Sequence, residues 1–134
     1  MDADLRTRLT AAAAAVRQHA HAPYSGFAVG AALADEQGRI HAGCNVENAA
    51  YPQGLCAEAV ALGALVAAGG RAVTAVVLVA GQGRPAPPSG GCRQKLREFA
   101  GAEVPVHCRS VDGAVLDTTM GALLPMSFGP EALA

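Results

Sequence analysis

Two cysteine-containing segments and one carboxylate are the residues of this sequence best suited to chemistry. Cys56 and Glu58 stand two residues apart in Leu-Cys-Ala-Glu-Ala, and Cys92 follows in Pro-Pro-Ser-Gly-Gly-Cys-Arg-Gln. Two thiolates can hold zinc, and a carboxylate outside the ligand set can carry protons. Bound zinc lowers the pKa of a water to about 7, so that a nucleophile is available at neutral pH. We therefore expect a hydrolytic zinc site with Cys56 and Cys92 as ligands and Glu58 as the proton carrier.

One residue of the second segment departs from a zinc-binding pattern. Ser89 follows proline and precedes Cys92 by three residues, where a Pro-Cys-x-x-Cys pattern would place another thiolate. A neutral hydroxyl is a much poorer zinc ligand than a thiolate. Either Ser89 or a water could complete the ligand set.

Each chemical residue must be positioned by an element, and the pattern of the chain predicts these elements. Helical spacing and good helix formers predict helices over residues 3–21, 56–68 and 92–100, followed by a short helix over 119–124. Apolar runs predict strands over 27–34, 39–45, 73–80, 104–108 and 114–116. Cys56 and Cys92 then fall in the first turns of their helices, where the helix dipole favours a thiolate or a carboxylate. The structural alternative for Glu58 is a surface acid that merely interacts with this dipole.

A polar segment precedes the first cysteine segment. Asn45 and Glu47 lie at the end of a predicted strand, among apolar residues. One interpretation is a turn whose Asn side chains bond the local backbone. The other is that both side chains project the same way and bind the hydroxyls of a sugar beside the metal. The position just upstream of Cys56 favours the second interpretation.

Length and composition restrict the class of protein. A chain of 134 residues suits a single domain over residues 1–134, which can bury a core without metal support, so the zinc would be catalytic rather than structural. About half of the residues are apolar and 16% are charged. This low charge predicts that part of the surface lies in an oligomer interface.

Charge and cysteine usage restrict partners and location. The net charge is −1 and the ten basic residues are scattered, which argues against a nucleic-acid substrate. No segment resembles a signal peptide or a membrane span, so we expect a cytoplasmic protein without a membrane partner. Cys44 and Cys108 fall inside strand patterns and are predicted to be inert core thiols.

Several motifs, taken together and in order, resemble one known family. They are Ala-Pro-Tyr-Ser-x-Phe-x-Val-Gly-Ala-Ala-Leu at 22–33, Gly-Cys-Asn-Val-Glu-Asn-Ala-Ala-Tyr at 43–51, Cys-Ala-Glu at 56–58, Gly-Cys-Arg-Gln at 91–94 and Leu-Leu-Pro-x-x-Phe at 123–128. The set is similar to cytidine deaminases of the short, homotetrameric kind, and it runs over nearly the whole chain.

The resemblance implies a fold, a reaction and an assembly. The fold would be an α/β protein, a three-layer α/β/α sandwich around a five-stranded mixed sheet. The reaction would be zinc-dependent hydrolysis of cytidine or 2′-deoxycytidine to uridine or 2′-deoxyuridine and ammonia, a step of pyrimidine salvage. The small-molecule nucleoside would bind in active sites shared across the subunits of a homotetramer.

The resemblance also implies a role for each matching residue. The metal ligands would be Cys56 and Cys92, and Glu58 would move protons to the ring nitrogen N3 and the leaving amine. The substrate-binding residues would be Phe27 against the pyrimidine, Asn45 and Glu47 on the ribose, and Ala57 between the two chemical groups. Ala49, Tyr51 and Phe128 match residues that approach an adjacent subunit's site.

The sequence departs from the family at two positions. Ser89 replaces a cysteine ligand, and Ala59 follows Glu58 where many relatives carry an arginine that offsets the charge of three thiolates. Two thiolates alone balance Zn²⁺, so the two changes are electrostatically consistent. Two alternatives stay open: a nucleoside-binding pseudoenzyme that has lost its metal, and a deaminase of another aminated heterocycle.

Overall fold

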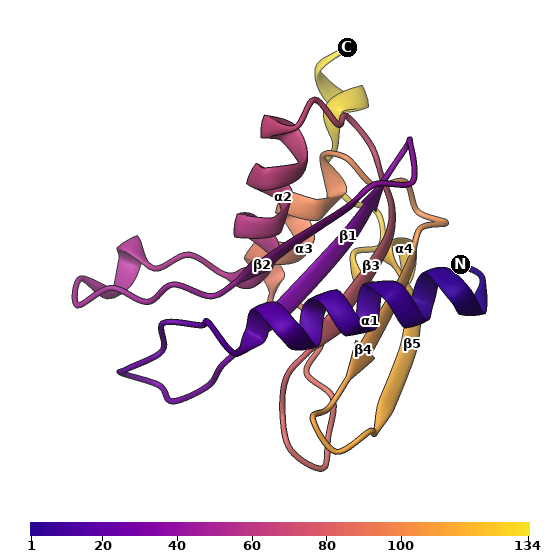
Figure 1. The fold of residues 1–134 in the computed structure, drawn as a ribbon. Coiled ribbons are helices and arrows are strands. Elements are labelled where there is room, and N and C mark those ends of the chain that lie inside the picture. The colour runs from indigo at the N-terminus through magenta and orange to yellow at the C-terminus, as the bar shows by residue number, and fades with distance from the viewer.

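The computed structural model describes residues 1–134 and shows a sheet with helices on both faces (Figure 1). The five strands lie in the order β2-β1-β3-β4-β5. Their bounds are β1 Gly30–Asp35, β2 Ile40–Cys44, β3 Val73–Val79, β4 Pro105–Arg109 and β5 Val115–Thr119. All five predicted strands are therefore present.

The sheet is mixed, as expected. β1 pairs antiparallel with both β2 and β3, and β4 pairs antiparallel with β5. β3 and β4 are parallel, and the chain crosses between them through helix α3 (Gly90–Arg97). Parallel neighbours need such a crossover, whereas the antiparallel pair β1–β2 needs only a turn. A turn between Asp35 and Ile40 joins them, with Gly38 at a φ of 79°.

The structure has three layers, and an apolar core lies between the sheet and each layer of helices. Helix α1 (Ala3–Arg17) packs on one face of the sheet, over β1, β2 and β3, while α2 (Ala57–Ala67) and α3 cover the other face (Figure 1). The larger core, with Leu33, Leu65 and Leu78 among its members, lies on the α2–α3 side. The smaller core, around Leu9 and Val77, lies under α1. The predicted three-layer α/β/α sandwich is confirmed.

Glycines allow both layers of helices to approach the sheet closely. A Cβ at Gly30 would lie 1.9 Å from the carbonyl oxygen of Ala13 on α1, and one at Gly43 would lie 2.3 Å from the amide nitrogen of Ala61 on α2. No side chain fits at either distance. Helices therefore approach the backbone closely at Gly30 on β1 and at Gly43 on β2.

The first helix is shorter than predicted. Helix α1 ends at Arg17, and the chain then pairs with the segment that follows β2: the His21 amide donates to the Asn45 carbonyl, and the Glu47 amide donates to the His21 carbonyl. These bonds replace the last helical turn expected from sequence, because a backbone group that has a long-range partner does not need an intrahelical one.

The C-terminal segment leaves the layered core. The predicted short helix is α4 (Met120–Leu123), and a last 3-10 turn, η2, covers Pro130–Leu133. Between them Met126 and Phe128 are exposed. The structure contains no helix of the length and apolar character that a membrane crossing requires.

Candidate metal centre and substrate pocket

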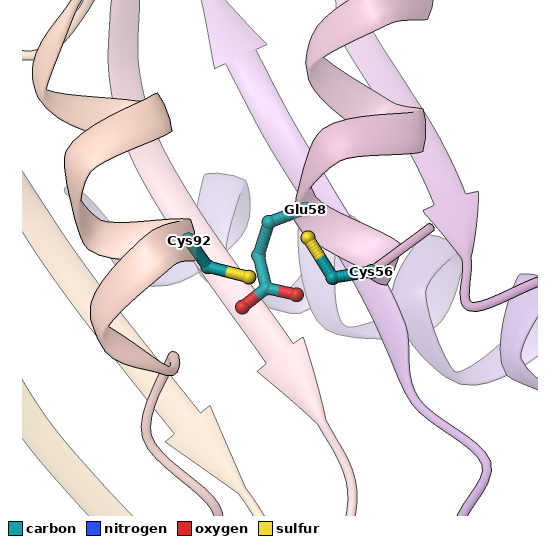
Figure 2. Close-up of side chains that lie close together, drawn as sticks. All are labelled: Cys56, Glu58 and Cys92. Carbon is teal, nitrogen blue, oxygen red and sulfur yellow. The ribbon is translucent and has the colours of Figure 1, made fainter. Parts of the chain in front are cut away.

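The starts of two helices carry the expected chemical groups. Cys56 is the N-cap of α2, where its sulfur accepts a hydrogen bond from the Ala59 amide at 3.4 Å. Glu58 follows in the first turn of α2, and Cys92 lies in the first turn of α3. Figure 2 shows the Glu58 carboxylate between the two sulfur atoms, with all three side chains directed into the same space.

The three groups are close enough to share one cation. Their ligand atoms all lie within 4.8 Å of one another, and no other His, Cys, Asp or Glu cluster of three does so. Cys92 and Glu58 are buried, and Cys56 is partly exposed toward the pocket. Two thiols are a soft donor pair that suits zinc, and catalytic zinc sites typically use three protein ligands and one open position. The donor chemistry fits zinc, with a third ligand position still to be assigned.

The surroundings of the two thiols shift their pKa values in opposite directions. The neighbouring Cys92 thiol lowers the pKa of Cys56 to about 6, and the hydrogen bond from the Ala59 amide adds to this effect. The proximity of Cys56, together with burial, raises the pKa of Cys92, because ionisation of both thiols would place two negative sulfurs side by side. Burial also raises the pKa of the Glu58 carboxyl.

Ser89 lies beside this centre. It is the N-cap of α3, yet its side chain makes no capping hydrogen bond. Its hydroxyl instead lies near enough to Cys92 to favour the thiolate form, against the larger effects that raise the pKa of that thiol. An N-cap serine normally bonds the helix amides. The Ser89 hydroxyl is therefore not engaged by its own helix and lies near Cys92.

A pocket of about 390 Å³ opens onto the three groups. Its lining includes most of the residues singled out in the sequence, namely Phe27, Asn45, Glu47, Tyr51, Cys56, Ala57, Glu58, Ser89 and Cys92. This volume is in the range of small-molecule sites. Strand-end, loop and helix-start residues thus converge on a single cavity.

Asn45 and Glu47 have partners of their own in the pocket wall. The Asn45 amide accepts from the Val29 amide and donates to the Phe27 carbonyl, both at 2.9 Å. The Glu47 carboxylate accepts from the Tyr24 and Ser25 amides and from the Ser25 hydroxyl, and these bonds lower its pKa. The local backbone bonding and the position in the pocket, considered as alternatives from sequence, occur together.

Two of the residues named from sequence lie outside this pocket. Ala49 and Phe128 are exposed and do not line it. Tyr51 reaches the rim but is 74% exposed, with its ring centroid 5.7 Å from that of Tyr24. Ala49 and Phe128 could therefore contact a substrate only if that substrate were bound in the pocket of another copy of the chain.

Sequence reasoning missed some residues that shape the site. Leu55 and Leu78 line the pocket, and Arg93 fixes the loop before α3 by donating to the carbonyls of Pro88 and Leu123 at 2.7 and 2.9 Å. The apolar lining residues carry no chemical signal. Arg93 does stand in the Gly-Cys-Arg-Gln motif, and its position beside a ligand cysteine could have indicated a supporting role.

Comparisons with known proteins agree with this geometry. Residues 4–108 match a family model described as the cytidine and deoxycytidylate deaminase zinc-binding region. The chain is 41% identical to the cytidine deaminase of Sporosarcina psychrophila, over 94% of this chain and 93% of that protein. It is 43% identical to the cytidine deaminase of Mycobacterium tuberculosis, over 96% and 90% of the two chains. The crystal structure of the Burkholderia pseudomallei cytidine deaminase superposes with a TM-score of 0.87 at 41% identity, covering 96% of this chain and all of that one.

Proposed function

Because the chain belongs to the cytidine and deoxycytidylate deaminase family, we propose that it hydrolyses cytidine and 2′-deoxycytidine to uridine and 2′-deoxyuridine with release of ammonia. The observation that carries this proposal is the convergence of Cys56, Glu58 and Cys92 at the base of a nucleoside-sized pocket. A family likeness alone would not indicate activity, since a pocket could survive the loss of its chemistry.

Zinc is the metal that the donor atoms favour. The Cys56 and Cys92 sulfurs would supply two ligands, and the Ser89 hydroxyl, which is not engaged in capping, would supply the third. When bound, zinc would provide a nucleophilic water by lowering its pKa toward neutrality. The start of each helix supports the negative sulfurs through its dipole.

Glu58 would carry the protons of the reaction. It lies within reach of both sulfurs at the base of the pocket, so it can accept a proton from the attacking water. It would deliver this proton to ring nitrogen N3 as the oxygen joins C4, and then pass the second proton to the amino group as the C4–nitrogen bond breaks. Its burial keeps bulk water from intercepting these transfers.

The wall of the pocket would select a nucleoside. Phe27 lines the pocket and offers an aromatic face to the pyrimidine, and Ala57 leaves room beside the ring. Asn45 and Glu47 would bind the sugar hydroxyls. Their bonds to the backbone hold both side chains in place before the substrate arrives, and a carboxylate has lone pairs to spare for further donors.

Assembly would complete the site. We infer that residues 1–134 form one deaminase domain that assembles as a homotetramer and acts in pyrimidine salvage in the cytoplasm. Phe27, Tyr51 and Leu55 line the pocket and are exposed, and Tyr24 is exposed beside Tyr51. Large apolar side chains gathered at one place on a small domain favour burial against another subunit. Ala49, Tyr51 and Phe128 would then approach the pocket of a neighbouring copy.

A direct assay tests the proposed activity. Purified protein is incubated with cytidine, 2′-deoxycytidine or adenosine, and the loss of the amino group is followed by absorbance and by ammonia release. We expect turnover of the two cytosine nucleosides alone. Nucleoside binding without turnover would support the pseudoenzyme alternative, which the missing third thiolate favours. Turnover of adenosine or of another aminated ring would instead indicate a different substrate class.

A further inference from the structure

A groove on the opposite side of the sheet is separate from the deaminase pocket. Helix α1 packs mainly on β1, β2 and β3, and one side of it borders β4 and β5. A hollow of about 800 Å³ lies where α1 meets these two strands. Figure 1 shows α1 crossing the sheet while the connected ends of β4 and β5 extend beyond it. None of the groove's lining residues lines the deaminase pocket.

Three arginines line this groove. Arg6 and Arg17 are about three helical turns apart and so lie on one stripe of α1, while Arg109 comes from β4. None of the three forms an ion pair with a carboxylate, although other arginines of the chain do. Arg17 uses one nitrogen to bond the Ala28 carbonyl, and the rest of its guanidinium group is free. The groove therefore holds a surplus of positive charge.

A buried histidine adds a further polar group to the floor. His107 is 5% exposed, and its Nδ1 lies 2.6 Å from a carboxylate oxygen of Asp117, its partner across β4 and β5. Asp117 is the only carboxylate in the lining, and it is already engaged by His107. Nε2 of His107 has no partner in the chain, yet no buried side-chain nitrogen or oxygen is left unpaired. That nitrogen must therefore reach the solvent of the groove.

The remaining lining is apolar and partly exposed. Val111 and Val115 are 49% and 48% exposed. On the helix side of the groove, Ala11 and Ala14 have small side chains that take up little room. An inorganic anion alone would leave this surface and most of the volume unused. A hydrophobic ligand would leave the arginines unpaired. The lining thus fits a ligand that has an apolar, ring-like body and several negative charges.

We propose that the groove binds a nucleoside polyphosphate, with its phosphates on Arg6, Arg109 and the free part of Arg17 and its base against Val111 and Val115. Guanidinium groups bind phosphate oxygens in pairs, which makes them the strongest phosphate donors among side chains. His107 Nε2 would contact the same ligand. The site is independent of the deaminase pocket and does not depend on the reaction proposed for it.

Binding of ATP tests this proposal, because adenine does not suit a cytosine pocket. Calorimetry of the full chain should give a dissociation constant below about 1 mM that weakens steeply with salt. Pyrophosphate should bind more weakly than ATP, and adenosine should not bind measurably. The double variant Arg6→Ala/Arg109→Ala should weaken ATP binding at least tenfold, whereas Arg8→Ala, which removes a charge on the same helix that Asp4 already pairs, should change it little.

Several results would overturn the proposal. They are no heat of binding with ATP at millimolar concentration, equal loss of binding in Arg8→Ala, or displacement of ATP by saturating uridine, which would place it in the other pocket. A lower mass of the double variant by light scattering would show instead that the groove contacts a second copy. Circular dichroism melts of both variants verify that each is folded.

Discussion

The sulfur atoms of Cys56 and Cys92 lie within 4.8 Å of each other although they come from the starts of two different helices. Helices α2 and α3 lie on the same face of the sheet, and their N-terminal ends meet beside the end of β3 (Figure 2). Each helix directs its positive end toward the shared space. The layered fold thus brings together two thiols that are far apart in the chain.

Replacing the proton carrier should separate chemistry from metal binding. Glu58→Gln keeps the size of the side chain and removes its ability to exchange protons, so turnover of cytidine should fall by about 10² to 10⁴. Zinc content and thermal stability should stay close to those of the natural protein. Glu98→Gln, at an exposed position at the end of α3, is the matched control and should retain full activity. Near-normal turnover of Glu58→Gln would remove this residue from the mechanism.

The exposed C-terminal phenylalanine should act on a neighbouring site. Phe128 is 60% exposed and does not line this chain's pocket. Phe128→Ala should therefore raise KM for cytidine several-fold while the melting temperature changes little. Met126→Ala, at a fully exposed side chain of the same segment, is the control and should leave KM unchanged. An active monomer in light scattering would contradict the shared-site assembly.

Most of the fold was predictable because local patterns and long-range packing agree. The apolar runs predicted strands at β1 and β3, and both strands are present and almost wholly buried. The end of α1 was not predictable, because the backbone from His21 onward pairs with residues 45–47, which lie far along the chain. Such a bond leaves no trace in the sequence around the helix.

The candidate site was predictable where residue type carries chemistry. Cys56, Glu58 and Cys92 were identified from spacing and chemistry, and the structure brings them together. Leu55 and Leu78 could not be identified, because an apolar pocket wall looks like any core residue. The basic residues were expected to be scattered, and only the packing of α1 on the sheet brings Arg6 and Arg109 to the same groove.

A side chain larger than that of glycine should not fit at Gly43, where β2 contacts α2. Gly43→Ala would place a Cβ 2.3 Å from the Ala61 amide nitrogen, so either the helix or the strand must move. Overpacking of this kind costs about 1–3 kcal/mol of unfolding free energy. Gly63→Ala on the open face of α2, where a Cβ meets nothing within 4 Å, should instead stabilise by about 0.5–1 kcal/mol. Urea titration of both variants measures the difference, and equal stability would contradict the packing described.

Restoring a thiolate at the third ligand position should tighten the metal. Ser89→Cys adds a stronger zinc donor beside Cys92, so chelators should remove zinc from the variant more slowly than from the natural protein. Substitution with Co²⁺ should show stronger sulfur-to-metal absorption for Ser89→Cys, because one more thiolate is bound. Ser89→Ala should lose metal more readily if the hydroxyl is a ligand. Equal chelator resistance of all three forms would show that another group occupies the position.

The most direct test of the account is the zinc content of the natural protein, measured together with its turnover. Protein produced in zinc-replete medium is analysed for metal per chain and assayed on cytidine before and after treatment with a chelator. We expect close to one zinc per chain, loss of deamination as the metal is removed, and recovery when zinc is returned. Protein that binds cytidine but carries no zinc and deaminates nothing would contradict the account.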